Sequence, residues 1–168
     1  VGLALVRGFA ELGVEARLKW PNDVLLGEGK LAGILIETQG DVQSGASAVI
    51  GIGINLAVTA AAAERAGTPV ASLAEAMAHP PERNRLLITL LTGLEAALRH
   101  FDREGFAPFA GEWMAAHAHQ GRPVRILGAL GEERSGTALG VDDQGALLLG
   151  TAEGVRAVHA GEVSLRPC

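Results

Sequence analysis

Apolar residues recur over positions 1–13 at the spacing of an amphipathic helix, and Gly13 stands where such a helix would end. Residues 84–102 carry the strongest helical pattern of the chain, and a further helix is predicted over 106–119. Because each helix has one apolar side, we expect it to pack on a sheet. The apolar stripe of the longest helix is predicted to consist of Leu87, Leu90, Leu91, Leu94, Ala97, Leu98 and Phe101.

Between the first two helices, the pattern changes to short β-branched and apolar runs that are typical of strands. The turn at 21–23 separates two of these runs and predicts a hairpin, and the polar stretch 40–47 predicts a loop between the other two. The alanine-rich segment 57–67 is expected to be a mobile loop, whereas residues 72–75 are expected to cap and start a short helix. The predicted strands cover 16–20, 24–26, 31–38 and 48–56.

Beyond residue 121 the chain consists of short alternating runs separated by turns. The strands predicted there cover 122–127, 133–141, 146–149, 155–158 and 163–165. Roughly 47 residues with this pattern fit a small β-barrel. We therefore predict an α/β (α+β) chain in two parts. Residues 1–120 are expected to form a mixed sheet with a ligand site on one face and helices on the other, and residues 121–168 the barrel.

The composition fits a globular chain that buries a real core, because 48% of its 168 residues are hydrophobic and the mean hydropathy is +0.26. The net charge of −5 argues against a nucleic-acid partner, which would require a clustered basic surface. Cys168 is the only cysteine, which excludes an intrachain disulfide and favours a reducing, cytoplasmic setting. Arg7 and Glu11 interrupt the apolar N-terminal run, so no membrane span is expected. Val1 lies inside a predicted helix, which suggests a fragment of a longer protein.

Three short motifs stand out because each joins polar or glycine residues to a predicted strand. They are Lys19-Trp20-Pro21-Asn22-Asp23-Val24, Lys30-Leu31-Ala32-Gly33-Ile34-Leu35-Ile36-Glu37 and Gly51-Ile52-Gly53-Ile54-Asn55-Leu56. Further segments are Gly105-Phe106-Ala107-Pro108-Phe109 with Trp113, Gln144-Gly145-Ala146-Leu147-Leu148-Leu149 and Gly161-Glu162-Val163-Ser164-Leu165-Arg166. Each motif is weak alone, but their order and spacing resemble those of the biotin protein ligase family over nearly the whole chain.

The resemblance implies a class II synthetase-like catalytic domain, N-terminally incomplete in this chain, followed by an SH3-like domain. It implies an enzyme that uses ATP to activate biotin to biotinyl-5′-AMP and transfers the biotinyl group to a lysine of a biotin carboxyl carrier protein. Biotin, ATP and Mg²⁺ are the implied ligands, and the carrier domain of a biotin-dependent carboxylase is the implied partner. No covalent nucleophile is evident, so the enzyme would act by positioning and charge stabilisation.

Lys30 is the catalytic candidate. The implied reaction brings the biotin carboxylate against the α-phosphate of ATP, two anions that repel by about 4 kcal/mol at about 4 Å and an effective dielectric of about 20. Lys30 follows a glycine-containing turn and opens a buried strand, from which its ammonium group could reach both anions. The matching lysine of the family has this role. Without the surrounding motif, Lys30 would be interpreted as the polar start of a strand.

Glycines within the predicted strands are, with Lys30, the candidate biotin-binding residues. Gly33 lacks a Cβ inside a bulky strand, so a ligand could lie directly on its backbone, and its family counterpart contacts the biotin head group. Gly51 and Gly53 permit the same close approach on the neighbouring strand. The alternative for these two glycines is a bulge or tight sheet packing.

Asp23 and Asn55 supply oxygen atoms of the type that Mg²⁺ prefers, and the resemblance implies that they bind it together. Their alternative role is local, as a turn aspartate and a strand-end asparagine that satisfy backbone donors. Trp20 is expected to pack in the core beside the site, and Asn22 to shape the turn that presents Asp23. The implied ATP- or adenylate-binding residues are Lys19, Asn22, Asn55 and Leu56.

The chain departs from the family's pattern in two places. After the third motif the family often places a large apolar or aromatic side chain against adenine, where this chain offers only Val58, alanines and Val70. The family also carries a Gly/Arg-rich loop and further biotin-contacting residues upstream of the segment with which this chain begins. We therefore predict that the 168-residue chain alone does not form biotinyl-adenylate at a normal rate.

Three other functions stay open from the sequence: a catalytically silent biotin-binding or dimerisation fragment, a lipoate ligase-like enzyme, and a biotin-sensing repressor. The residues of the first and third motifs favour biotin over lipoate as the substrate. A homodimer is plausible because exposed strands in half-open sheets pair readily. His117 and His119 form a His-x-His pair, but residues two apart on the predicted helix point in different directions, so no zinc site is expected.

Overall fold

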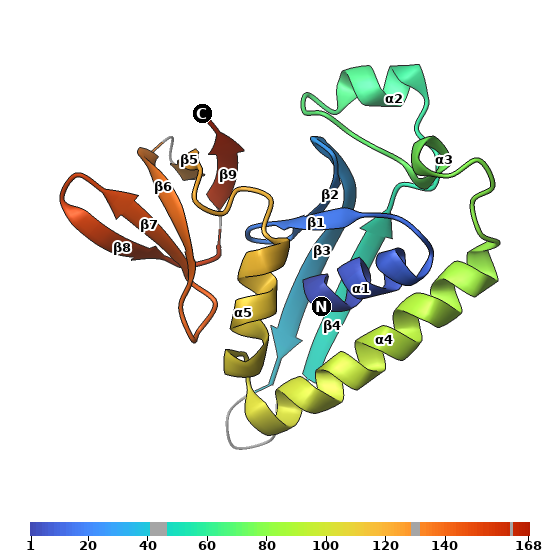
Figure 1. Ribbon diagram of the computed structural model, residues 1–168, viewed down its shortest axis with the longest axis horizontal. Helices are drawn as coiled ribbons and strands as arrows, with labels where there is room; N and C mark the ends of the chain where they lie inside the picture. The colour runs from blue at the N-terminus through green and yellow to red at the C-terminus, as the bar shows by residue number, and fades with distance from the viewer. Residues whose placement is uncertain (41–46, 129–131, 162) are drawn as a thin grey trace.

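A four-stranded sheet forms the first part of the molecule (Figure 1). The computed structural model describes residues 1–40, 47–128, 132–161 and 163–168, and the predicted loop over 40–47 lies largely outside them. The strands follow the order β1-β2-β3-β4, and every neighbouring pair is antiparallel. Their bounds are β1 Ala16–Lys19, β2 Asp23–Leu26, β3 Gly29–Gln39 and β4 Ser47–Ile54.

The prediction of a mixed sheet is wrong in its strand directions. Short turns join β1 to β2 and β2 to β3, and strands connected in this way pair antiparallel. Parallel pairing in the described part of the chain is limited to two isolated bridges, Leu18 with His117 and Lys30 with Val70. The rest of the α/β prediction is confirmed, because strands and helices build one shared core.

Helices cover one face of this sheet (Figure 1). α1 (Gly2–Glu11) contacts β1, β2, α4 (Arg83–Glu104) and α5 (Ala107–Ala116). Its buried side chains Leu5 and Phe9 pack with apolar residues of β2, β3 and α4 in the main core. The core therefore lies between the sheet and the helical layer, and the opposite face of the sheet stays accessible.

The apolar stripe of α4 is narrower than predicted. Leu90, Leu94 and Ala97 are buried, as expected, and Leu86, which was not predicted, joins them. The others remain exposed: Leu87 54%, Leu91 52%, Leu98 37% and Phe101 51%. Among the described residues, α1 and the first sheet cover only one side of α4. The spacing of apolar residues thus predicted the helix correctly, but it did not show how much of the apolar surface other elements cover.

The segment after β4 contains a helix where a loop was predicted. α2 (Ala60–Arg65) forms within 57–67, because alanine has the highest helix propensity and Thr59 caps the helix, with its Oγ1 accepting a bond of 3.3 Å from Ala62 N. The predicted cap of the next helix, α3 (Leu73–Ala76), is confirmed, since Ser72 N donates to the Glu75 side chain at 2.9 Å.

A second, five-stranded antiparallel sheet follows α5, and its order is β8-β7-β6-β5-β9. All five predicted strands are present: β5 Pro123–Gly128, β6 Glu133–Val141, β7 Leu147–Thr151, β8 Gly154–Val158 and β9 Val163–Pro167. Their pairing leaves β8 and β9 as the two edges, so the described residues show no closed barrel. The SH3-like barrel stays a prediction.

Trp20 joins the two parts of the molecule. It follows β1, yet its side chain is 2% exposed and packs in the core of the second sheet with residues such as Val124 and Leu149. Its Nε1 donates a hydrogen bond to Gly145 O at 3.3 Å. The expectation that Trp20 packs in a core is confirmed.

Candidate active site

Four of the residues predicted for the site form a single row across the first sheet. In the strand register Lys19 pairs with Asp23, Asp23 with Gly33, and Gly33 with Gly53. Residues directly opposite one another in an antiparallel sheet present their side chains on the same face. The fold therefore places one residue from each strand side by side.

Lys30 joins this row through an irregularity in β3. Val24 pairs with Ala32 but Leu25 pairs with Lys30, so the register shifts by one residue between them. In a regular strand residues 30 and 33 would point to opposite faces, and a bulge of this kind re-aims a side chain. A Cβ added to Gly33 would lie 3.0 Å from the Lys30 Nζ, which shows that the ammonium group covers the Gly33 backbone.

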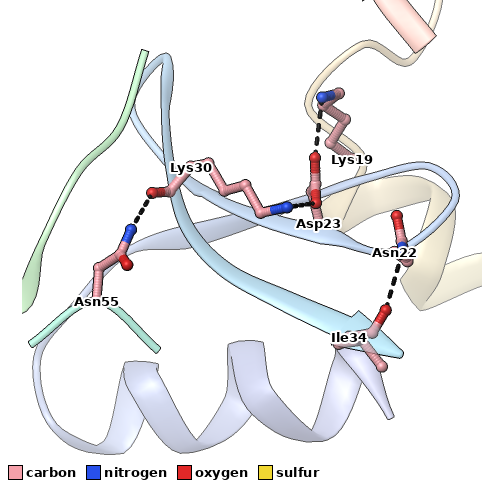
Figure 2. A network of polar contacts seen from close by, with 6 residues as sticks. All are labelled: Lys19, Asn22, Asp23, Lys30, Ile34 and Asn55. Atoms are coloured by element: carbon pink, nitrogen blue, oxygen red, sulfur yellow. Dashed lines mark hydrogen bonds and ion pairs between the residues drawn. The ribbon is translucent and has the colours of Figure 1, made fainter. Parts of the chain in front are cut away.

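Asp23 binds both lysines of the chain (Figure 2). Its Oδ1 lies 2.5 Å from Lys30 Nζ, and its Oδ2 accepts a hydrogen bond of 3.0 Å from Lys19 Nζ. Burial alone would raise the pKa of Asp23, but the bonds from Lys30 and Lys19 outweigh it and hold the pKa below its usual value. Two ammonium groups against one carboxylate leave a net positive charge. The Lys30 side chain is 42% exposed, whereas those of Lys19 and Asp23 are each 13% exposed. An anion can therefore approach this cluster most readily at Lys30.

Asn22 and Asn55 hold β3 on either side of this row. Asn22 Nδ2 donates to Ile34 O at 2.9 Å, and Asn55 Nδ2 donates to Lys30 O at 2.9 Å (Figure 2). Both amides thus fix the backbone that carries Lys30 and Gly33. Leu56, expected near the nucleotide, packs its side chain partly buried against the main core.

The predicted magnesium pair does not fit this arrangement. Each oxygen of Asp23 already faces an ammonium group, so its carboxylate is not open to a cation. Asn55 bonds the Lys30 carbonyl through Nδ2, which leaves its Oδ1 outside that bond, so the misfit lies at Asp23. Groups of three or more acidic, histidine or cysteine side chains that could hold a metal are absent from the described ranges. The cause is the β1–β2 register, which puts Lys19 opposite Asp23 where a cation would have to bind.

The polypeptide around residue 70 clamps the backbone of Lys30, which the sequence did not predict. Lys30 N donates to Pro69 O at 2.9 Å, and Ala71 N donates to Lys30 O at 3.0 Å. Gly29 is buried under this segment, and a Cβ there would meet Val70 C at 2.8 Å and Ala71 N at 2.9 Å. Both contacts are to backbone, which cannot move aside as a side-chain end can.

A Gly29→Ala substitution is therefore expected to lower the free energy of unfolding by about 1–3 kcal/mol, because the added methyl group overpacks this contact. Urea unfolding followed by circular dichroism measures the change. Gly111→Ala is the matched control, since a Cβ at this position in α5 meets nothing within 4 Å. Equal unfolding midpoints for Gly29→Ala and the unaltered chain would contradict the clamp.

A cavity of about 330 Å³ lies beside the two ion pairs. Lys19, Asp23 and Lys30 line it together with His119 and Arg166, which come from the C-terminal part of the chain. Sequence reasoning did not select His119 or Arg166 for the site, because their approach depends on how the two sheets pack. His117 and His119 also do not lie on a helix, since α5 ends at Ala116 and His117 is extended.

His117 makes the stability of the fold dependent on pH. Its side chain is fully buried, and burial with the neighbouring His119 lowers its pKa from 6.5 to about 4. The folded chain therefore binds this proton less tightly than the unfolded chain does, and stability is lost as the pH falls from about 6.5 towards about 4.

At about pH 5 this difference corresponds to a loss of about 2 kcal/mol relative to about pH 7.5, which urea unfolding at the two pH values can measure. A His117→Phe variant is expected to lose much of this pH dependence. The exposed His159 supplies the control, because His159→Gln is expected to keep it. An unchanged pH dependence in His117→Phe would show that other groups cause the acid sensitivity.

Comparison with known families agrees with the motifs. Residues 2–55, which hold the whole row, match the family described as "Biotin/lipoate A/B protein ligase family". Residues 119–166, which hold the second sheet, match "Biotin protein ligase C terminal domain". The fold and the matched residues thus define a member of the biotin/lipoate class of ligases.

Individual relatives narrow this class. The chain is 37% identical over 168 residues to the "Bifunctional ligase/repressor BirA" of Escherichia coli K12, covering 99% of this chain and 51% of that protein. It is 38% identical over 155 residues to the "Biotin--[acetyl-CoA-carboxylase] ligase" of Paracoccus denitrificans, covering 90% of this chain and 64% of that protein. The crystal structure of biotin protein ligase from Aquifex aeolicus matches with a TM-score of 0.86 at 28% identity, over 99% of this chain and 72% of that chain.

The chain belongs to the biotin protein ligase family. It spans about half the length of the BirA relatives that it matches. In the described segments, no helix has the length and apolar character needed to cross a membrane.

Proposed function

We propose that this chain carries the C-terminal share of the machinery that activates biotin with ATP and transfers it to a lysine of a biotin carboxyl carrier protein. The observation that carries the proposal is the Lys30 ammonium group, anchored by Asp23 and lying over the bare backbone of Gly33. A related structure of the Aquifex aeolicus enzyme in complex with biotin and ATP supports it, with a TM-score of 0.85 at 27% identity.

In the proposed reaction the biotin carboxylate attacks the α-phosphorus of ATP, pyrophosphate leaves, and biotinyl-5′-AMP forms. The amine of the carrier lysine then attacks the carbonyl carbon of this mixed anhydride, AMP leaves, and an amide bond forms as the amine loses a proton. Lys30 would neutralise the carboxylate and the α-phosphate while they approach each other. Asp23 would hold the ammonium group in place until the two anions arrive.

The open face of the sheet supports a biotin site on glycine backbone. Gly33 pairs with Gly53, and Leu35 pairs with Gly51, so three residues without Cβ atoms lie on one face. The neighbouring residues Ile52 and Ile54 pack instead against the core. A flat ligand could lie on this stretch next to Lys30.

Lys19, Asn22, Asn55 and Leu56 remain proposed contributors to ATP or adenylate binding. Lys19 lines the cavity beside Lys30, which supports a contact with phosphate. The other three support the site through the backbone. The Asn22 and Asn55 amides bond the backbone of β3 at Ile34 and Lys30. Asn55 O and Leu56 O accept bonds of 3.0 Å each from Leu73 N and Ala74 N of α3.

A two-stage experiment tests the proposed function. Binding of radiolabelled biotin and radiolabelled lipoate is measured with ATP present, and biotinyl-5′-AMP is then sought by chromatography from α-labelled ATP. We expect biotin to bind and lipoate not to bind, with adenylate formed more slowly than by a longer relative. Preference for lipoate would favour the lipoate ligase alternative. Biotin binding without any adenylate would favour the silent biotin-binding fragment, and binding of neither ligand would contradict the proposal.

A second copy of the chain is the proposed partner at the edge of the first sheet. Among the described strands β4 lies at an edge of the first sheet, and Leu35, Ile36 and Val49 near it are 63%, 50% and 61% exposed. Edge strands with apolar side chains pair readily. Sedimentation velocity should show a concentration-dependent dimer that Val49→Lys disrupts, and a monomer at all concentrations would exclude it.

We further propose that the protein acts in the cytoplasm, which its single, free Cys168 supports.

A further inference from the structure

The segment from His117 to His119 extends the first sheet beyond β1. His117 forms a parallel bridge with Leu18, and Ala118 N donates to Leu18 O at 2.8 Å. The guanidinium group of Arg17, also on β1, donates to His117 O at 3.2 Å. β1 ends at Lys19, so this segment holds the strand that delivers one of the two ammonium groups to Asp23.

Both imidazole rings of this segment are buried without hydrogen bonds. His117 is 0% and His119 is 3% exposed, and none of their four ring nitrogens has a partner among the described residues. His117 stacks on Trp113 with ring centroids 4.7 Å apart, and His119 meets the edge of His117 at 5.9 Å. A buried polar group without a hydrogen bond destabilises the fold, so apolar side chains would stabilise it better. Two such rings beside the ion pairs therefore call for a functional reason.

The surroundings of His119 are mainly positive. Burial lowers the pKa of His119 most, Glu28 in the turn before β3 opposes this effect, and Lys19, Arg122 and Arg17 lower the pKa further. The Gln120 side chain favours a charged His117 but makes no hydrogen bond of normal geometry to it. Arg166 of β9 lines the same cavity as His119. A proton on His119 would therefore add a positive charge to a cluster that already holds several.

We propose that His119 is a positioning residue for Lys19: as an uncharged ring it allows segment 117–119 to lie against β1, and as a charged ring it repels Lys19 from Asp23. The pair between Lys19 and Asp23 is the one at risk, because its two side chains are only 13% exposed and are little screened by water. Asp23 also holds Lys30 at 2.5 Å, so a loosened Lys19 changes the charge balance around Lys30. The consequence for catalysis rests on the proposed function, whereas the coupling between His119 and the ion pair does not.

Nuclear magnetic resonance of the 168-residue chain tests the coupling, because the chain contains only two lysines, Lys19 and Lys30. The ammonium nitrogens are observed with ¹⁵N-labelled lysine and the Asp23 carboxylate with ¹³C. His119→Arg introduces a permanent charge, and His119→Met is an uncharged control of similar length. At about pH 7.5 we expect the Lys19 ammonium protons of His119→Arg to exchange with water about tenfold faster than those of His119→Met, with a shifted Asp23 carboxylate signal.

The pH dependence of the same nuclear magnetic resonance signals gives a second test. In the unaltered chain the Asp23 and Lys19 signals are expected to move together as His119 gains its proton, and in His119→Met this step is expected to vanish. His119→Gln replaces His119→Met if the latter does not fold. Equal Lys19 and Asp23 signals in the Arg and Met variants would overturn the proposal. Neither test needs ligase activity, so coupling in a chain that binds no biotin would leave this inference standing and defeat the proposed function.

Discussion

Replacing Lys30 with methionine is expected to lower the rate of biotinyl-adenylate formation at least about a hundredfold. The two anions repel by about 4 kcal/mol at about 4 Å and an effective dielectric of about 20, and about 1.4 kcal/mol corresponds to a factor of ten in rate. Methionine keeps the length and packing of the side chain but removes the charge. Single-turnover conversion of α-labelled ATP in the presence of saturating biotin measures the effect even when the basal rate is low.

Three further variants show whether the loss is specific. Lys19→Met is expected to cost about tenfold, because its ammonium group is mostly buried and is directed at Asp23 rather than outwards. Lys30→Arg keeps the charge but not the compact ammonium geometry, so it should restore only part of the rate. Arg125→Met, an exposed change in β5, should have no effect. A Lys30→Met rate within about threefold of the unaltered chain would contradict the proposed role.

Adding a methyl group at Gly33 is expected to weaken biotin binding about tenfold or more, which corresponds to about 1.4 kcal/mol. A Cβ there would lie 3.0 Å from Lys30 Cε and Nζ and 3.9 Å from Asp23 Oδ1. The flexible lysine end can move aside, so Gly33→Ala should fold, but the ammonium group would leave its place and the added methyl group would occupy the space above the backbone that a ligand needs. Equilibrium binding of radiolabelled biotin measures this change.

Gly53→Ala separates the effect on Lys30 from direct contact with the ligand. Gly53 pairs with Gly33 across β3 and β4, and a Cβ at Gly53 meets no protein atom within 4 Å. The variant should therefore fold as the unaltered chain does. Any loss of biotin affinity in Gly53→Ala would then report a ligand lying on that residue. Unchanged biotin affinity in Gly33→Ala would show that the ligand does not lie on Gly33.

Local patterns predicted most elements of the fold, and the errors arose where packing decided the outcome. The alternating runs after residue 121 predicted all five strands of the second sheet, because a strand half buried on one face leaves a period of two. The same patterns carry no information on strand direction, which led to the prediction of a mixed sheet. They also do not show how much of an apolar stripe is covered, so Leu87 and Phe101 were expected inside but lie exposed.

The residues of the row were selected from the sequence, but their arrangement was not, and His119 and Arg166 in the cavity were missed. The motifs selected Lys19, Asp23, Lys30, Gly33 and Gly53, which the structure brings together. The register shift that turns Lys30 onto this face depends on pairing with β2, which no local pattern shows. The resemblance implied Asp23 as a magnesium ligand, and the sequence alone does not show that the ammonium groups of Lys19 and Lys30 face its carboxylate.

The central claim is that Lys30 leaves Asp23 to bind the two anions of the reaction, and the two-lysine composition of the chain makes it directly observable. A titration of ¹⁵N-lysine-labelled chain with a non-hydrolysable biotinyl-5′-adenylate analogue follows both ammonium signals. We predict that the Lys30 signal shifts on saturation while the Lys19 signal keeps its position beside Asp23. A Lys30 signal that stays unchanged when the analogue is bound would contradict the account.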